Sequence, residues 1–198
     1  MLVGNIETRF ANAVAGAKMG FEPNDKVTGF NLPNANPGVG GDNVSLDDVL
    51  TDAGAIVVFE CNHCPYVVAS VERIESLAGR ARELGMGFIG INSNDAVNYP
   101  DDSFENMSKR ADKGMSYPYL HDEDQQVATD WGAERTPEFY LLDGEGTVVY
   151  RGRMDDSPKD PTRVSSRDLQ NALDVFSMGN QPPVNRTQSI GCSVKWKY

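Results

Sequence analysis

The sequence predicts an α/β domain in which a mixed central sheet is flanked by helices. The apolar run AIVVF (55–59) precedes a helical pattern and a second strand-like run, MGFIGIN (86–92). Strands joined by a helical crossover pair in parallel. The segment EFYLLDGEGTVVYRG (138–152) has two strand-like runs around a Gly-rich turn, which is typical of an antiparallel hairpin. A chain of 198 residues buries enough surface for one such domain without disulfide cross-links.

The segments before the first strand predict an irregular start. The first fifty residues are rich in Gly, Asn and Pro, and FNLPNANPGVGGDNVSLDDVL (30–50) reads as an extended piece, turns and a short helix. We therefore divide the chain into an N-terminal extension (1–24), the α/β domain (25–180) and a C-terminal tail (181–198) that packs on the domain.

A long helix is predicted directly after the first strand. Apolar residues recur there at spacings of three and four, which is the pattern of an amphipathic helix. Gly85 is a suitable left-handed stop. The apolar positions are Val67, Val68, Val71, Ile74, Leu77, Ala78 and Ala81.

Three further helices are predicted from the remaining patterns. SFENMSKRADKG (103–114) ends in basic residues, and DQQVATDWG (124–132) is a shorter helix. SRDLQNALDVFSMG (166–179) begins with Ser166 as a plausible N-cap. The tail that follows opens with two prolines and contains basic residues but no acidic ones.

The composition excludes some classes of partner. The formal net charge of −11 argues against nucleic acid, because phosphate binding needs clustered Lys and Arg. No apolar run approaches the length of a membrane span, and residues 1–20 lack the pattern of a secretory signal. We therefore expect a cytoplasmic protein without a membrane partner. Thiols are reduced in that compartment, so a close cysteine pair is more often catalytic or metal-binding than structural. The oligomeric state does not follow from the sequence.

The segment FECNHCPYV (59–67) contains two of the three cysteines. Haem attachment requires histidine directly after the second cysteine, where this chain has Pro65. A structural zinc site requires four ligands, and His63, inside the pair, cannot readily join the same tetrahedron. A redox disulfide requires a strand, a C-x-x-C pair and a helix, and all three are predicted here. We therefore expect no metal and no bound cofactor.

The position of the pair relative to the helix suggests roles for the two cysteines. Pro65 is tolerated in the first turn of a helix because the missing N–H has no helical acceptor. A helix N-terminus stabilises a thiolate. We expect Cys61, at the exposed helix N-terminus, to be the nucleophile and Cys64, one turn into the helix, to be the resolving thiol.

Several segments together resemble the thioredoxin superfamily, and within it the redoxin (AhpC/TSA-like) branch. They are CNHCPYV, INSND, RTPEFYLLD, GRMDD and TQSIGCSVKWK, and the similarity spans roughly residues 25–198. The resemblance implies a thioredoxin-like fold in which Thr136–Pro137 is a cis-proline pair that shapes the substrate groove. It also implies a thiol–disulfide oxidoreductase of the antioxidant type. Its partners would be protein or small-molecule disulfides and a dithiol reductant.

Two alternatives to that function remain. The same branch contains peroxiredoxins, whose P-x-x-x-T-x-x-C motif would place Pro at 54 and Thr at 58. This chain has Gly54 and Val58 there, and Pro137 stands where that family has its arginine. Both departures count against thiol peroxidase activity. The second alternative is a redox-sensing binding module that does not turn over.

His63, Glu60 and Pro65 are candidates for tuning the redox chemistry, and Cys192 is a candidate additional thiol. A protonated His63 beside the Cys61 thiolate would make the couple more oxidising, as in the DsbA pattern that CNHC resembles; alternatively, His63 only fills space. Glu60 would raise a neighbouring thiol's pKa or relay protons, although a solvated carboxylate is the simpler expectation. Cys192 is an additional redox thiol if the tail folds over the active site, and otherwise a small packing residue.

Overall fold

A computed structural model describes residues 20–198. Most of the predicted N-terminal extension (1–24) therefore lies outside the described residues. The core of the fold is a five-stranded sheet with the strand order β5-β4-β3-β7-β8. The strands are β3 (Ala55–Phe59), β4 (Gly87–Asn92), β5 (Tyr119–His121), β7 (Glu138–Leu142) and β8 (Val148–Gly152).

The sheet is mixed, as the sequence predicts. The β3–β4 and β4–β5 pairs are parallel, whereas β3–β7 and β7–β8 are antiparallel. Strand β3 is central and buried on both faces because its residues alternate between two apolar clusters. This order places the end of β3, where the two cysteines follow, in the middle of the sheet edge.

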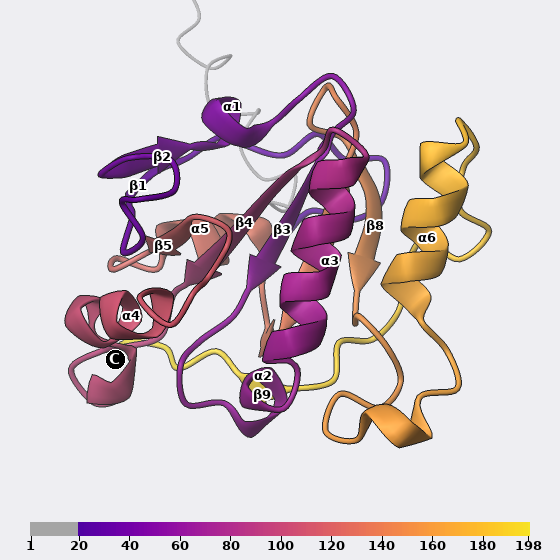
Figure 1. The fold of residues 1–198 in the computed structure, drawn as a ribbon. Coiled ribbons are helices and arrows are strands. Elements are labelled where there is room, and N and C mark those ends of the chain that lie inside the picture. The colour runs from indigo at the N-terminus through magenta and orange to yellow at the C-terminus, as the bar shows by residue number, and fades with distance from the viewer. Residues whose placement is uncertain (1–19) are drawn as a thin grey trace, which may run out of the picture.

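Helices cover both faces of the sheet (Figure 1). One face packs against α3 (Val71–Glu83), α4 (Phe104–Ala111) and α6 (Asp168–Ser177). The other face packs against α5 (Gln126–Trp131), α1 (Leu46–Val49) and the hairpin of β1 (Asn31–Pro33) and β2 (Asn43–Ser45). This arrangement is a thioredoxin-like fold.

The long helix predicted after the cysteines is two helices. Helix α2 (Pro65–Val68) ends before Ser70, and α3 begins at Val71. Ser70 is buried, and its Oγ donates to the carbonyl oxygen of Pro158 at 2.9 Å. The break turns Val68 outward, so its side chain is 59% exposed although the periodicity places it on the apolar stripe. In α3 the stripe is confirmed at Ile74, Leu77, Ala78 and Ala81, whereas Val71 is half-buried, and Gly85 (φ 74°) follows the last turn.

Two smaller features differ from the sequence prediction. Strand β5, only three residues long, is absent from the predicted order. Ser166 is not the N-cap of α6, because that position is Arg167, while Ser166 Oγ donates to Asp168 Oδ1 at 2.8 Å. The remaining elements are β6 (Arg135–Thr136), β9 (Cys192–Ser193) and two 3₁₀ turns, Pro100–Asp102 and Pro161–Arg163.

Both ends of the described chain pack on the domain. Phe21 contacts the ring of Trp131, which is buried. The tail runs along the bottom of the molecule in Figure 1 and passes α2, where β9 pairs with β6. Among residues 20–198, no helix combines the length and the apolar character needed to cross a membrane.

Candidate active site

The two cysteines of the C-x-x-C pair are buried at the end of β3. Cys61 follows β3 after one residue, and Cys64 is the N-cap of α2, with Pro65 at the first helical position. Both thiols are free, and Cys61 is only 1% exposed. The expectation that Cys61 occupies an exposed helix N-terminus is therefore wrong. Residues 61–63 form a turn that precedes the helix, so Cys64 lies at its start and not one turn inside.

Thr136 lies against both sulfur atoms. Its Oγ1 is 3.4 Å from Cys61 Sγ, and its carbonyl oxygen accepts a hydrogen bond from the Cys64 thiol at 3.1 Å. The Thr136–Pro137 peptide bond is cis, as the sequence predicts. The fold thus places Thr136 and Pro137 next to the dithiol, although they lie more than seventy residues further along the chain.

Hydrogen bonding shifts the pKa values of the two thiols in opposite directions. The hydrogen bond from the Cys61 thiol, together with the Val67 N–H, lowers the pKa of Cys64. The same hydrogen bond to Cys64, burial and the charge of Asp102 raise the pKa of Cys61. The negative charge of the singly ionised pair is therefore favoured on Cys64, whereas the sequence predicted the thiolate at Cys61.

Asp102 is a buried carboxylate that the sequence analysis missed. It is fully shielded from solvent at the end of a 3₁₀ turn. Its Oδ1 accepts from Asn62 N at 2.7 Å and Asn92 Nδ2 at 3.2 Å, and its Oδ2 accepts from Asn94 Nδ2 at 2.8 Å. Three donors compensate the burial of the charge and fix the carboxylate beside the turn that holds Cys61.

His63 connects this carboxylate to the thiols. Its Nδ1 is 2.6 Å from Asp102 Oδ2, and its ring stacks on Tyr99 with the ring centroids 5.5 Å apart. One ligand atom each of Cys61, His63 and Asp102 lies within 4.8 Å of the other two. This group does not include Cys64, so the expectation that His63 cannot readily join one tetrahedron with both cysteines stays a prediction. The three residues bring a thiol, an imidazole and a carboxylate together, which is the combination of groups that can activate a thiol.

Glu60 is buried, which overturns the expectation of a solvated carboxylate. It forms an ion pair with Arg110 and accepts a hydrogen bond from Tyr117 Oη at 2.8 Å. Although burial opposes it, Glu60 raises the pKa of Arg110. Strand β4 has glycine at position 90, where a Cβ would overlap Glu60 Oε1.

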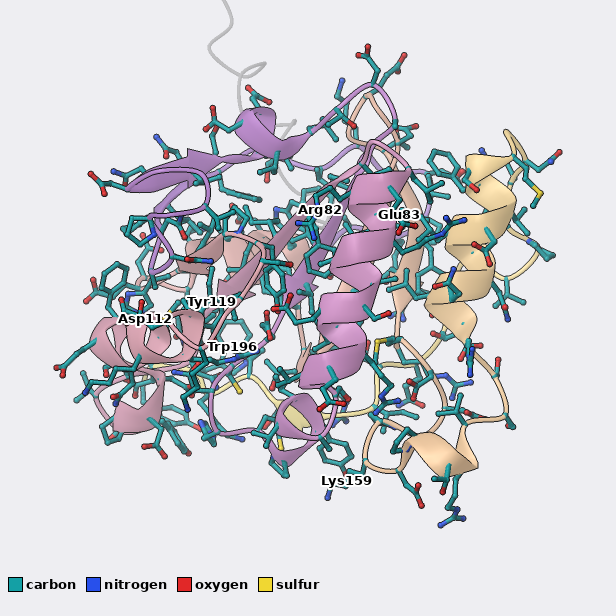
Figure 2. The ribbon with its side chains drawn as sticks, in the orientation of Figure 1. Arg82, Glu83, Asp112, Tyr119, Lys159 and Trp196 are labelled. Carbon is teal, nitrogen blue, oxygen red and sulfur yellow. The ribbon has the colours of Figure 1, made fainter. Side chains whose placement is uncertain are left out.

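Arg110 joins this network to the C-x-x-C turn. Its Nη1 donates to the Cys61 carbonyl oxygen at 3.0 Å and to Tyr119 Oη at 3.2 Å. Figure 2 shows Tyr119 beside α4, the helix that supplies Arg110. The carboxylate whose charge acts on Cys61 is Asp102, while the Glu60–Arg110 pair holds the turn in place.

The third cysteine lies beside the second. Strand β9 places Cys192 opposite Thr136 in an antiparallel pair. Cys192 packs against the cluster that contains Cys61 and Cys64, and burial, together with the neighbouring Cys64, raises the pKa of the Cys192 thiol. The tail therefore folds over the dithiol, and its residues 191–193 cover Thr136, so the predicted substrate groove is occupied by the chain itself.

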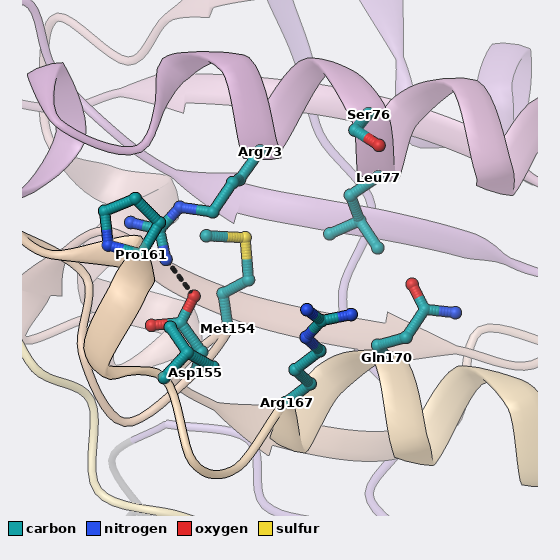
Figure 3. A pocket seen from close by; sticks show the side chains of 9 residues that line it. Arg73, Ser76, Leu77, Met154, Asp155, Pro161, Arg167 and Gln170 are labelled. Atoms are coloured by element: carbon teal, nitrogen blue, oxygen red, sulfur yellow. Dashed lines mark hydrogen bonds and ion pairs between the residues drawn. The ribbon is translucent and has the colours of Figure 1, made fainter.

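The GRMDD segment forms a separate cleft of about 280 Å³. In Figure 3 Arg73 and Asp155 form an ion pair on one side of it, with Arg167 and Gln170 opposite. Asp156 accepts hydrogen bonds from the Ser165 and Ser166 N–H groups. No cysteine lines this cleft.

Comparisons with known proteins agree with this geometry. The family model described as Redoxin matches residues 22–173. The crystal structure of an uncharacterized conserved protein from Geobacillus kaustophilus is 41% identical and has a TM-score of 0.82, covering 89% of this chain and 93% of that one. The thioredoxin domain of a thiol-disulfide oxidoreductase from Bacteroides vulgatus shares the fold, at 16% identity and a TM-score of 0.55 over 71% of this chain and 94% of that one.

A sequence relative has a name that specifies a redox reaction. A Mycobacterium tuberculosis protein called "Putative peroxiredoxin" is 26% identical over 126 residues, which is 64% of this chain and 73% of that protein. Together with the paired free thiols, these findings support a redox function for the chain.

Proposed function

The chain belongs to the Redoxin family, and from that premise we propose that it is a thiol–disulfide oxidoreductase that uses the Cys61–Cys64 pair. The observation that carries the proposal is the convergence of two free, buried thiols on Thr136, with Cys61 Sγ 3.4 Å from its Oγ1 and Cys64 Sγ 3.1 Å from its carbonyl oxygen. The partners are protein or small-molecule disulfides and a dithiol reductant.

Cys61 is the attacking thiol because it is the one next to a proton acceptor that reaches solvent. His63 is 25% exposed at its side chain and ion-pairs with Asp102. Both sulfurs are buried, but Cys61 is the one grouped with the partly exposed His63, whereas Cys64 lies against Thr136, which pairs with Cys192 of the tail. The Cys61 proton passes to His63 or to Cys64 as its sulfur attacks the substrate disulfide.

Cys64 then resolves the mixed disulfide. Because its pKa is lowered, Cys64 readily gives up its proton, and the thiolate that forms is the nucleophile in disulfide exchange. Attack on Cys61 Sγ breaks the bond to the substrate, which leaves as a thiol, and forms the Cys61–Cys64 disulfide. A dithiol reductant reverses these steps, and neither step needs a metal or a cofactor.

Our proposals about the compartment and about the excluded partners are based on the sequence. We place the protein in the cytoplasm, where a reductant would return the pair to its dithiol form. The net charge of −11 disfavours nucleic acid as a partner.

The test is turnover of insulin disulfides by the wild-type protein with a dithiol reductant. Cys61→Ser removes the attacking sulfur and is expected to abolish turnover. Cys64→Ser removes the resolving sulfur, so the variant is expected to accumulate a mixed disulfide at Cys61, visible as an added mass that dithiothreitol removes.

Two results would contradict the proposal. Dithiol-dependent turnover by Cys61→Ser would show that the nucleophile is misassigned. Stoichiometric capture of one partner by the wild type, without turnover, would instead support a redox-sensing module.

A thiol peroxidase is the second candidate, and one contact favours it. The Thr136 hydroxyl is 3.4 Å from Cys61 Sγ, so a hydroxyl does reach the thiol although position 58 is valine. The M. tuberculosis relative carries a peroxiredoxin name. Two observations count against peroxidase activity. Arg110 is already bound to Glu60 and to the Cys61 carbonyl oxygen, and Pro137 occupies the position of the peroxiredoxin arginine. We therefore rank disulfide exchange first.

A further inference from the structure

The three cysteines form a continuous row. The sulfurs of Cys61 and Cys64 both contact Thr136, and β9 pairs Cys192 with the same Thr136, where it packs against the cluster that contains the other two cysteines. Cys61 and Cys64 are buried, whereas Cys192 is only partly buried. The row therefore leads from the thiol beside His63 to a thiol at the molecular surface.

Strand β9 holds Cys192 in this position through specific contacts. Gly191 lies so close to β6 that a Cβ there would overlap the Thr136 carbonyl oxygen. Arg135 Nη1 donates to the Gly191 carbonyl oxygen at 3.0 Å, and Val194 N donates to Glu134 O at 3.0 Å. Figure 1 shows this part of the tail beside α2, the helix that Cys64 caps.

Contacts beyond β9 fix the rest of the tail. Asp95 N donates to Lys195 O at 2.8 Å, and Lys195 N donates to Asn94 Oδ1 at 2.8 Å. Gln125 adds a hydrogen bond from Nε2 to Lys195 O at 2.8 Å. The close approach of Cys192 to Cys64 is thus maintained from both sides.

We propose that Cys192 is a third redox thiol, which takes over the disulfide from Cys61–Cys64 as a Cys64–Cys192 bond. The proposal rests on the dithiol function above and extends it. Cys192 Sγ attacks Cys64 Sγ, the Cys61–Cys64 bond breaks, and Cys61 leaves as a thiolate that takes up the proton lost by Cys192. One disulfide replaces another, so no further oxidant or reductant is needed.

The transfer changes the redox state of both Cys61 and Cys192. Cys61 becomes a free thiol again and is ready for a second substrate disulfide. The oxidising equivalent now lies on the partly exposed Cys192, where a dithiol reductant reaches it. Strand β9 then is covalently tied to α2, so the redox state sets whether the tail stays over Thr136 and Pro137.

The experiment maps disulfides in the wild-type protein after chemical oxidation. Reduced protein is treated with one equivalent of diamide, the remaining thiols are alkylated in denaturant, and the protein is digested with trypsin without reduction. Cys61 and Cys64 share the peptide 27–73, and Cys192 lies in 187–195. We expect a linked pair of these peptides in which Cys61 is the alkylated residue.

Matched variants fix which sulfur is used. Cys61→Ser is expected to give the linked pair as its single disulfide product, whereas Cys64→Ser is expected to lose it, because Cys192 contacts Cys64. Far-ultraviolet circular dichroism checks that each variant folds. The wild-type measurement decides the proposal even if a variant does not fold.

Two outcomes would overturn the proposal. The first is full alkylation of Cys192 in oxidised wild type together with a quantitative Cys61–Cys64 disulfide. The second is a linked pair found only in Cys61→Ser, since that would show contact without transfer. Neither outcome affects the proposed function, whose own failure appears as absence of insulin turnover by the wild type.

Discussion

At the scale of single residues, Asp102 determines the environment of the dithiol although it is not part of the motif. Its carboxylate raises the pKa of Cys61 after the effects of the Cys64 hydrogen bond and burial. It also holds His63 at 2.6 Å through Oδ2. The sequence around it, YPDDSF, offers two adjacent aspartates and no periodic pattern that would single out the buried one.

Removing this charge is expected to lower the pKa of Cys61. In a Cys64→Ser/Cys192→Ser background only the Cys61 thiol titrates, and Asp102→Asn removes the negative charge that opposes its ionisation. The ultraviolet absorbance of the thiolate as a function of pH should therefore rise at lower pH than in the parent. The substitution also disturbs three hydrogen bonds, at a cost of about 1–3 kcal/mol of stability.

The neighbouring carboxylate provides the control for this measurement. Asp101 is exposed, and only its backbone carbonyl oxygen contacts Asn62. Asp101→Asn should leave the titration of Cys61 unchanged. An equal shift in both variants would indicate a general surface-charge effect and would refute the specific role of Asp102.

His63 is expected to make the couple more oxidising. In its protonated form it pairs with Asp102 and faces the Cys61 sulfur, so it stabilises the reduced, ionised dithiol. His63→Pro should therefore make the Cys61–Cys64 couple more reducing in a glutathione redox titration. About 2 kcal/mol of stabilisation corresponds to about 45 mV. His63→Ala separates loss of the imidazole from the conformational effect of proline, and an unchanged potential in both variants would rule out the charge.

At the scale of elements, the tail strand decides which substrates reach the site. Strand β9 pairs with β6 at Thr136, and Cys61, whose Sγ lies 3.4 Å from Thr136 Oγ1, is 1% exposed. A protein disulfide therefore requires β9 to move, because an extended partner segment would need the same edge of β6.

Gly191→Ala is expected to loosen this cover. The added Cβ would overlap the Thr136 carbonyl oxygen, so β9 must shift away from β6. Oxidation of Cys61 by a protein disulfide should then become faster than in the wild type, measured by quenched alkylation and mass spectrometry. Gly79→Ala in α3 is the matched control, because no atom lies within 4 Å of its added Cβ. A rate that is unchanged in Gly191→Ala would show that the tail does not limit access.

The break between α2 and α3 has a role at the same scale. It lets the short α2 start at Pro65 with Cys64 as its N-cap, while α3 keeps its apolar stripe on the sheet. The buried Ser70 and its hydrogen bond to Pro158 O tie this junction to the 155–160 loop. Thus the geometry at Cys64 depends on a segment almost ninety residues away.

At the scale of the whole molecule, the sequence pattern predicted the elements that are long enough to show one. The runs at 55–59, 86–92 and 138–152 gave four of the five strands of the central sheet and its mixed character. Strand β5 was missed because Tyr119–His121 is too short to show a period. The helix break was missed because the apolar spacing continues through Ser70, whose burial depends on a distant carbonyl group.

The sequence predicted only those parts of the candidate site whose residues form a short motif. The C-x-x-C pair and the Thr136–Pro137 pair follow from motifs. The burial of Glu60, the approach of Asp102 to His63 and the contact of Cys192 with Cys64 arise from long-range packing. Charged residues such as Arg110 are exposed in most proteins, so nothing in one sequence marks it as the partner of Glu60.

The most direct test compares two oxidants on the reduced wild-type protein. Separate samples receive hydrogen peroxide or a protein disulfide at equal concentration, and the rate of Cys61 oxidation is followed by acid quenching, alkylation and mass spectrometry. Thiol–disulfide exchange predicts that the disulfide oxidises Cys61 faster and leaves a Cys61–Cys64 or Cys64–Cys192 bond. Faster oxidation by peroxide, with a sulfenic acid trapped at Cys61 in Cys64→Ser, would contradict it and assign the protein as a peroxidase.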